Sequence, residues 1–395
     1  MKGWTDAALA EVAEIGAGNS APQDKRLFQA GIHRFIRTSD VGQIRFGTIS
    51  TAADLLNDEG IKGLRLVPKG TILMPKSGAS TFLNHRVQMG EDGYVSSHLA
   101  TVRARCNLCD DRFLLYYLST IRAQDLIQDH RYPSLTLGAI GEIPISLPPL
   151  DEQKRIVAVL DQAFAALDRA RANAEANLAD AESLFEQVLL QSFDDILPSA
   201  SKKTLADTAA DFARGKSRHR PRNDPALYDG KYPFIQTGDV RNASGTISGF
   251  SQTYNEVGLA QSKLWPAGTV CITIAANIAE TGVLAMDACF PDSIIGMVAD
   301  PAQAIPHYVE YMLRYFAREL KLKGKGSAQD NINLATFENA LFPFPSLAEQ
   351  NAIVDKLNTL SVEIERLRAN YLQTEADITT LRQSLLQAAF SGQLT

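Results

Sequence analysis

The phrase PPLDEQKRIVAVL, which occupies residues 148–160, returns with close similarity as PSLAEQNAIVDKL at residues 345–357. When the chain is shifted by 197 positions, residues 150–193 align with residues 347–390 without a gap, and 15 of the 44 aligned positions are identical. Self-similarity of this extent at a fixed separation is the mark of an internal repeat. The chain is therefore built as a tandem duplication.

The repeat continues into the regions that precede the two phrases, with shifts of 198 or 199 positions. The matching pieces are FIRTSDV and FIQTGDV (35–41 and 234–240), GTIS (47–50 and 245–248), and VPKGTIL and WPAGTVC (67–73 and 265–271). Each half thus has one plan, a mixed domain followed by a long helix. We expect mixed domains at residues 1–147 and 198–344, and helical regions at residues 148–197 and 345–395.

The mixed domains show short β-branched runs bounded by Gly, Pro, Asn and Asp, which predict strands joined by turns. One amphipathic helix is predicted in each domain, near residues 113–126 and 308–320. The prolines in IPISLPPL and LFPFPSL exclude a continuous helix and predict an extended linker. The long helix then begins at DEQ or AEQ, where carboxylates in the first turn suit the positive end of the helix dipole.

The two long helices carry an apolar heptad pattern, rich in large residues in the second helix and in alanine in the first. A surface helix packed on its own domain is the simpler alternative, but the stripe is too narrow and the helix too long for that. We expect an intramolecular antiparallel coiled coil between two tandem mixed α/β domains, an α+β fold. The predicted seam is Leu160, Leu167, Leu184, Val188, Leu357, Leu360, Ile364, Leu367, Ile378, Leu381 and Leu385.

Composition is ordinary for a globular protein, and the net charge of −6 argues against non-specific coating of nucleic acid. The beginning of the sequence has no apolar signal core and no apolar run is long enough to span a membrane, so we expect a cytoplasmic protein without a membrane partner. Cys106 and Cys109 form one CxxC, but neither a second pair nor nearby histidines follow. Free thiols are favoured over a structural zinc site, which stays an alternative.

No catalytic motif is found. The chain has no phosphate-binding loop, no G-x-S-x-G elbow, no HExxH and no [ND]PP[YF] tetrapeptide. Asp40 and Asp239 repeat within the FIRTSDV and FIQTGDV phrases, and a turn-capping role is favoured over catalysis there. We therefore expect no catalytic residue, no metal site and no enzyme activity of the chain alone.

Positive charge gathers in loops, where Lys and Arg can neutralise phosphates while Arg, Gln and Asn can hydrogen-bond base edges. A solvated loop without a ligand is the alternative for each cluster. The candidate DNA-binding residues are Lys25, Arg26, Arg34, Arg37, Lys76, His85 and Arg86 in the first domain, and Arg214, Lys216, Arg218, Arg220, Arg222, Lys323, Lys325, Gln329 and Asn331 in the second.

The paired PPLDEQKRIV and PSLAEQNAIV phrases, the two mixed domains and the long helices resemble the specificity subunit of type I restriction–modification enzymes. GKGSAQDNINLATFENALFPFPSLAEQ, residues 324–350, is similar to the family's run from a Gly-Ser/Thr-x-Gln loop into the proline linker. The first half lacks the Gly-Ser-x-Gln-x-Asn piece, which leaves its corresponding loop in doubt. The resemblance covers essentially the whole chain.

The resemblance implies two target recognition domains that each read one half of a bipartite, asymmetric DNA sequence. It also implies helical regions that space the two halves and dock two methyltransferase subunits, with motor-nuclease subunits joining the assembly. Glu152, Gln153, Glu349 and Gln350 are the candidate docking residues. S-adenosylmethionine, ATP and Mg²⁺ would be bound by the partner subunits and not by this chain. A coiled-coil scaffold with two protein-binding domains and no role on DNA is the alternative.

Overall fold

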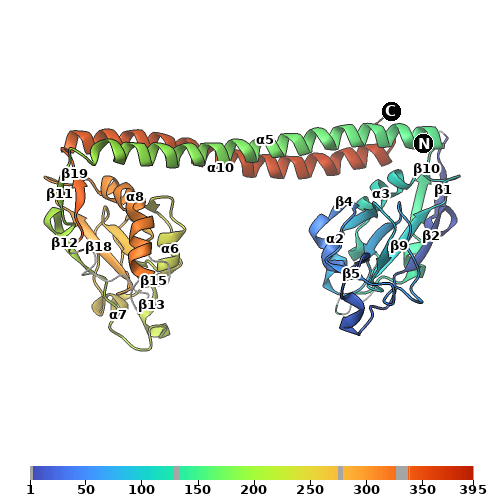
Figure 1. Cartoon of the computed structure of the whole chain (residues 1–395), viewed down its shortest axis with the longest axis horizontal. Coiled ribbons are helices and arrows are strands. Elements are labelled where there is room, and N and C mark those ends of the chain that lie inside the picture. Colours follow the sequence, from blue (N-terminus) through green and yellow to red (C-terminus); the bar gives the residue numbers. More distant parts are fainter. Residues whose placement is uncertain are drawn as a thin grey trace. The chain divides into compact units, whose positions relative to one another are not determined.

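In the computed structural model the described residues are 3–127, 131, 133–274, 279–325, 337 and 339–394, and the side chains of residues 318–325 lie outside that set. The chain forms two compact units. Unit 1 combines Met1–Ala174 with Leu372–Thr395, and unit 2 is Glu175–Tyr371. Each unit therefore contains one mixed domain and parts of both long helices (Figure 1).

The mixed domain of unit 1 contains a five-stranded sheet in the order β2-β9-β6-β7-β4, in which β4 and β7 are parallel and the other pairs antiparallel. A three-stranded sheet, β5-β3-β8, and a two-stranded sheet, β1-β10, complete it. The strands are β1 (Thr5–Ala8), β2 (Ala13–Ala17), β3 (His33–Ile36), β4 (Phe46–Ile49), β5 (Asp54–Leu56), β6 (Ile72–Pro75), β7 (Arg86–Met89), β8 (Tyr94–Val95), β9 (Leu99–Ala104) and β10 (Pro144–Leu147). The short helices are α1 (Leu9–Val12), α2 (Thr38–Ile44), α3 (Asp111–Thr120) and α4 (Leu137–Gly141).

Unit 2 repeats this plan. Its five-stranded sheet has the order β12-β18-β16-β17-β14, again with one parallel pair, β14 and β17, and β13-β15 and β11-β19 form two smaller sheets. The strands are β11 (Ser201–Lys203), β12 (Ala209–Arg214), β13 (Tyr228–Phe234), β14 (Thr246–Ile247), β15 (Gln252–Tyr254), β16 (Val270–Thr273), β17 (Thr281–Leu284), β18 (Ile294–Ala299) and β19 (Phe342–Phe344). The helices are α6 (Thr237–Arg241), α7 (Glu256–Ala260) and α8 (Pro306–Lys325). The shared strand order shows that the sequence repeat is a repeat of the fold.

The proline-rich segments before the long helices are extended, as predicted, but they are not free linkers. Residues 144–147 form β10, which pairs with β1, and residues 342–344 form β19, which pairs with β11. Each segment therefore fastens the start of its domain to the start of its long helix.

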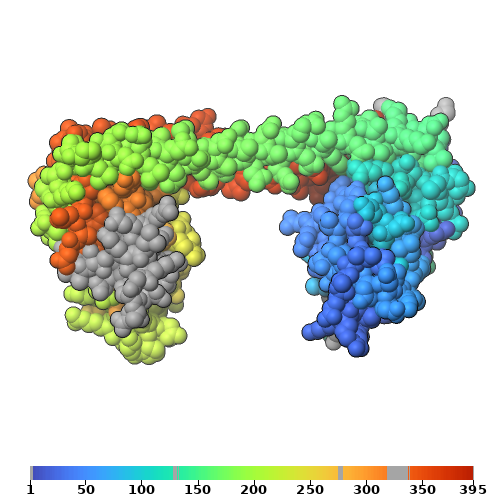
Figure 2. All heavy atoms as spheres, in the orientation of Figure 1, coloured from blue at the N-terminus to red at the C-terminus, as the bar shows by residue number. Residues whose placement is uncertain are grey.

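The long helices are α5 (Leu150–Ile196) and α10 (Leu347–Phe390), and they pack together as an antiparallel coiled coil. In unit 1, Asp168 of α5 bonds to Arg382 of α10, and in unit 2, Glu182 of α5 bonds to Arg368 of α10 at 2.7 Å. Each long helix has an aromatic residue at or near its end that packs on a helix of a mixed domain. Phe390 of α10 packs on Phe113 of α3, and Phe193 of α5 packs on Tyr308 of α8. On the face viewed in Figure 2, α5 stays exposed over the mixed domain of each unit.

Most of the predicted seam residues are buried or half-buried, and two of them are exposed. Leu160, Leu167, Val188, Leu357, Ile364 and Leu385 pack into the two hydrophobic cores, and Ile378 is buried at 9% exposure. Leu360 also packs on the core of unit 2 and Leu367 is half-buried. Leu184 and Leu381, however, are 51% and 48% exposed, so their assignment to the seam was wrong.

Leu184 is exposed because the seam residues of a heptad follow one another by steps of either three or four, and the sequence pattern does not fix where each step falls. The seam of α5 takes the step of four to Leu178 and Phe185, and Phe185 is 5% exposed. Where two apolar residues are adjacent, as at Leu184 and Phe185, the pattern alone does not say which of them faces the partner helix. The larger aromatic ring takes the buried position.

In the described part of the chain no helix is long and apolar enough to cross a membrane. The same residues contain no cluster of His, Cys, Asp or Glu arranged to hold a metal ion. Cys106 is exposed and Cys109 is buried, and burial raises the pKa of the Cys109 thiol to about 12. The predicted limits of the domains, at residues 147, 197 and 344, stay predictions.

Candidate nucleic-acid interface

In each of the repeated phrases, FIRTSDV and FIQTGDV, a strand of a smaller sheet is followed directly by a short helix. The Asp40 carboxylate accepts a hydrogen bond from the backbone N–H of Arg37 at 2.7 Å, and Asp239 accepts the equivalent bond from Gln236 at 2.8 Å. In both cases the aspartate is the third residue of the helix, and its carboxylate accepts from the backbone N–H of the residue just before the helix. This hydrogen bond caps the first turn of the helix. The predicted capping role of both aspartates is confirmed.

This cap fixes the direction of the residue that precedes each helix. In unit 1 that residue is Arg37, whose guanidinium bonds to Asp54 on β5 and lies 5.3 Å from the centre of the Phe35 ring. In unit 2 it is Gln236, whose amide donates to the Gln252 side chain on β15 at 2.6 Å. Each domain therefore presents a pair of facing polar side chains, which we call the polar pair, at one place of a shared scaffold.

The two pairs occupy equivalent positions by strand register. Phe35 of β3 lies opposite Asp54, and Phe234 of β13 lies opposite Gln252. The scaffold is thus the same while the hydrogen-bonding groups differ. One domain offers a charged pair and the other offers two neutral amides.

A surface depression surrounds each polar pair. In unit 1 a cavity of about 460 Å³ is bordered by Lys25, Arg37 and Asp54. In unit 2 a cavity of about 350 Å³ is bordered by Arg222, Asn223, Gln236 and Gln252. Amide and guanidinium groups at the edge of a depression can donate to and accept from base edges. Asn223, Gln236, Gln252 and Asp54 were absent from the sequence-based candidates, because they come together only in the folded domains.

The basic loop 214–222 lies beside the second depression. The Arg222 guanidinium bonds to Asp292 at 2.6 Å, while the Arg214 side chain donates to the Asp292 backbone oxygen at 2.9 Å. The Arg220 side chain donates to two backbone carbonyls of its own loop. Lys216 and Arg218 are exposed, and among the described residues neither side chain makes an ion pair. In the described structure these two are exposed cations of the loop that no carboxylate neutralises.

The first domain uses most of its candidate cations internally. Arg26 pairs with Asp24 at 2.6 Å and Arg34 with Glu91 at 2.7 Å. Lys25 is exposed and Lys76 half-buried, and in the described structure neither is ion-paired. His85 is half-buried, and burial and nearby arginines lower the pKa of its ring.

Arg86 cannot contact DNA, and that prediction was wrong. Its side chain is fully buried between β7 and α3 and donates to the backbone oxygens of His85 and Ile121. Burial lowers the pKa of its guanidinium to about 10. Gln329 and Asn331 lie outside the described residues, as do the side chains of Lys323 and Lys325.

The glutamines of the repeated phrase join each long helix to its domain. Gln153 is fully buried, accepts from the backbone N–H of Asp110 at 2.8 Å and donates to two backbone oxygens. Gln350 is equally buried, accepts from the N–H of Ile305 at 3.0 Å and donates to two backbone oxygens as well. Neither can meet a partner, so their assignment as docking residues was wrong. Glu152, half-buried beside Arg155, and Glu349, exposed beside Ser346, keep that prediction.

Comparison with known proteins assigns the chain to a family. The chain belongs to the family described as the type I restriction modification DNA specificity domain, whose model matches residues 1–177 and 208–373. The predicted resemblance is therefore confirmed. The two matches fall on the two halves of the duplication.

Curated relatives are distant. The specificity subunit of the type I restriction enzyme StySPI of Salmonella potsdam is 24% identical over 208 residues, which cover 50% of this chain and 44% of that protein. The EcoBI specificity subunit of Escherichia coli is 23% identical over 278 residues, which cover 64% of this chain and 58% of that protein. The chain spans about half the length of the curated relatives it matches.

Solved structures support the fold. The HsdS subunit from Thermoanaerobacter tengcongensis matches with a TM-score of 0.61 at 20% identity, over 100% of this chain and 98% of that one. A chain from a structure describing complex assembly and conformational transition of the type I R-M system matches with a TM-score of 0.75 at 20% identity, over 100% and 99% of the two chains. The predicted fold class, two mixed domains with a coiled coil between two long helices, is confirmed.

Proposed function

We propose that the chain is the DNA sequence-recognition subunit of a type I restriction–modification complex, in which each mixed domain reads one half of a bipartite, asymmetric target. The observation that carries this is the polar pair. The duplicated scaffold presents Arg37 with Asp54 in one domain and Gln236 with Gln252 at the equivalent place in the other. A protein that reads two different half-sites needs this combination of one framework and two sets of hydrogen-bonding groups.

The chemistry of each pair suits base contacts. An arginine can donate both its N–H groups to a guanine edge, and a glutamine can bond to adenine through its amide. Lys216 and Arg218 supply exposed positive charge beside the second pair, which fits phosphate contacts that position the domain.

The first test uses the chain assembled with its methyltransferase subunits. The target is found by methylome sequencing of a host that expresses the complex, and each half-site is then altered separately. We expect each alteration to abolish methylation, and Gln236→Ala to relax base preference in one half-site only. Methylation that survives loss of either half-site would refute the proposal.

A second test separates reading from electrostatic attraction. Arg218→Ala should weaken binding to all DNA sequences alike. It should also reduce the slope of log affinity against log salt concentration by about one, the value expected for one lost phosphate contact. Lys202→Ala is the matched control, because Lys202 is exposed on β11, next to the long helices and away from β13 and β15 (Figure 1). If the slope is unchanged in Arg218→Ala, the proposed contact between this loop and DNA is refuted.

The long helices are proposed to dock two copies of the methyltransferase subunit. Leu184 and Leu381, displaced from the seam, are both about half-exposed and occupy equivalent positions 197 residues apart. An exposed leucine that recurs at the same place in both helices fits a pair of identical docking faces. Motor-nuclease subunits would join this assembly.

The docking proposal predicts that methyltransferase copies are lost one at a time. Leu184→Asp and Leu381→Asp should each remove one methyltransferase copy in native mass spectrometry, and the double variant should remove both. Ala172→Asp, at another exposed helix position, is the control. Retention of both copies by the double variant would refute the assignment of these faces.

Catalysis is proposed to reside in the partners, which would bind S-adenosylmethionine, ATP and Mg²⁺, and the assembly would act on DNA in the cytoplasm. A coiled-coil scaffold without a DNA role is not favoured, because the family match covers both mixed domains.

A further inference from the structure

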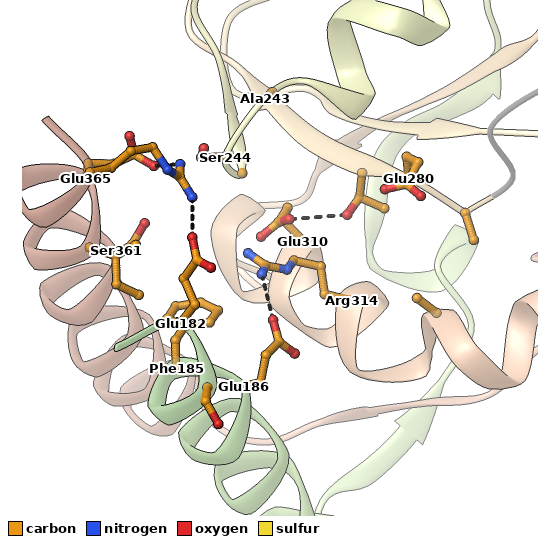
Figure 3. A pocket seen from close by; sticks show the side chains of 17 residues that line it. Glu182, Phe185, Glu186, Ala243, Ser244, Glu280, Glu310, Arg314, Ser361 and Glu365 are labelled. Atoms are coloured by element: carbon orange, nitrogen blue, oxygen red, sulfur yellow. Dashed lines mark hydrogen bonds and ion pairs between the residues drawn. The ribbon is translucent and has the colours of Figure 1, made fainter. Parts of the chain in front are cut away.

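A cavity of about 600 Å³ lies within unit 2, where α8 and the β14–β17 edge of the sheet meet the two long helices (Figure 3). Its walls include Ser244 from the loop before β14, Glu310 and Arg314 from α8, and Phe185 and Ser361 from the long helices. It is separate from the depression around Gln236 and Gln252, with which it shares no lining residue.

The corresponding space in unit 1 is occupied by aromatic rings. Phe46 stacks on Tyr116 with ring centres 5.7 Å apart, and Phe164 meets both rings at 6.4 and 5.4 Å. The sequence repeat aligns Phe46 with Ser244 and Phe164 with Ser361.

The contacts of α3 and α8 confirm that the two places correspond. Tyr116 of α3 bonds to Asp161 of α5, and Tyr311 of α8 bonds to Asn358 of α10 at 2.7 Å. Asp161 and Asn358 are themselves related by the shift of 197. Two serines in unit 2 therefore stand where two phenylalanines fill the first unit, and the exchange opens the cavity.

A buried carboxylate borders the opened space. Glu310 is 1% exposed, and its Oε1 accepts a hydrogen bond from the Thr281 hydroxyl at 3.2 Å. Its Oε2 is buried, and within the described residues it has no hydrogen-bond partner. Gly245, with φ of +89°, lies so close that an added Cβ would be 3.5 Å from Oε2. A buried carboxylate oxygen without a donor is costly, and a cationic donor is the group that satisfies it best.

The arginines of the cavity are already committed to other carboxylates. Arg368 bonds to Glu182 at 2.7 Å and to Glu365 at 2.6 Å, and Arg314 bonds to Glu186 at 3.3 Å. The cavity thus keeps an excess of negative charge at Glu310. Phe185 and Ile364 from the long helices give the cavity an apolar part of its wall.

We propose that this cavity binds a small aliphatic amine, whose ammonium group donates to Glu310 Oε2 while its methylene chain lies against Phe185 and Ile364. One unsatisfied carboxylate beside an apolar wall fits an organic cation. A divalent metal ion would need several oxygen ligands, and the described residues offer no such group.

Calorimetric titration of the full chain with 1,4-diaminobutane at pH 8 tests this, with ammonium chloride at matched ionic strength as the reference ion. We expect one saturable site for the diamine and none for ammonium. Glu310→Gln, which keeps the shape and the Thr281 bond, should weaken binding about tenfold or more, because a hydrogen bond between two charged groups is lost.

The space itself is tested by refilling it. Ser361→Phe restores the ring found at residue 164 and should abolish binding, whereas Val362→Phe, at the next and exposed position of α10, should leave it unchanged. Thermal unfolding of each variant shows whether it is folded, and Glu310→Gln keeps the test decisive if Ser361→Phe is not. No saturable site in the natural chain, or equal affinity in the natural chain and Glu310→Gln, would overturn the proposal.

Discussion

Glu310 makes the stability of unit 2 depend on pH in a direction that is unusual for a carboxylate. Burial raises the pKa of its side chain from 4.5 to about 7, a shift that nearby Arg314 and the Thr281 hydrogen bond oppose only in part. A raised pKa means that the folded state holds the proton more tightly than the unfolded state. The contribution of Glu310 to the free energy of unfolding is therefore most favourable below pH 4.5, and it is lost as the pH rises from 4.5 through 7.

The size of the effect follows from the shift. A difference of 7 minus 4.5, at about 1.36 kcal/mol per pH unit, corresponds to on the order of 3 kcal/mol in the free energy of unfolding. Glutamine has nearly the same shape, keeps an acceptor for Thr281 and carries no charge. Glu310→Gln should therefore match the natural protein near pH 4.5 and be more stable by roughly 3 kcal/mol at pH 8.

The assay is urea unfolding followed by the fluorescence of Trp265, which is fully buried in unit 2. A Trp4→Phe background removes the other tryptophan of the chain, which lies in unit 1. Glu365→Gln, on the rim of the same cavity, is the control and should change little. If Glu310→Gln and the natural protein respond in parallel to pH between 5 and 8, the assignment of a strained, ionised carboxylate at this position is refuted.

Further predictions concern the packing of the long helices and the buried arginine. Gln153→Ala and Gln350→Ala should each destabilise their own unit by about 1–3 kcal/mol in urea unfolding, because a buried N–H loses its acceptor; a change below about 0.5 kcal/mol would contradict the joint described above. Phe185→Ala should cost about 3–5 kcal/mol and Leu184→Ala under about 1 kcal/mol, and the reverse order would restore the original seam. Arg86→Met should be neutral or stabilising, because it replaces a buried cation, which has no carboxylate partner among the described residues, by an apolar chain of similar length. A large loss of stability would show that its two backbone bonds outweigh the cost of burial.

The duplication and the fold class could be predicted because they depend on many residues at once. Forty-four aligned positions with 15 identities survive the loss of any single match, and the two five-stranded sheets repeat their strand order as the repeat implied. The seam of the coiled coil depends on single choices between adjacent residues. Leu184 and Phe185 are both apolar, and only the shape of the facing surface decides which one is buried.

The candidate site was less accessible to prediction because charge along a sequence does not reveal ion pairing. Arg34 and Arg37 read as free cations, yet each meets a carboxylate from a distant segment, Glu91 or Asp54. Gln153 was expected at the surface because it is polar, yet it is fully buried. Its amide satisfies three backbone groups that the helix start and the neighbouring loop would otherwise leave buried and unpaired.

The polar pairs and the cavity share one origin in the duplication. Two copies of a scaffold need the same backbone hydrogen bonds, so Asp40 and Asp239 keep the same capping role in both. Positions that point away from those bonds can diverge without loss of the fold. Arg37 and Gln236 differ at a surface depression, and Phe164 and Ser361 differ beside the long helices. Places where the two halves share a backbone and differ in side chain are therefore the places where each half can have acquired a ligand of its own.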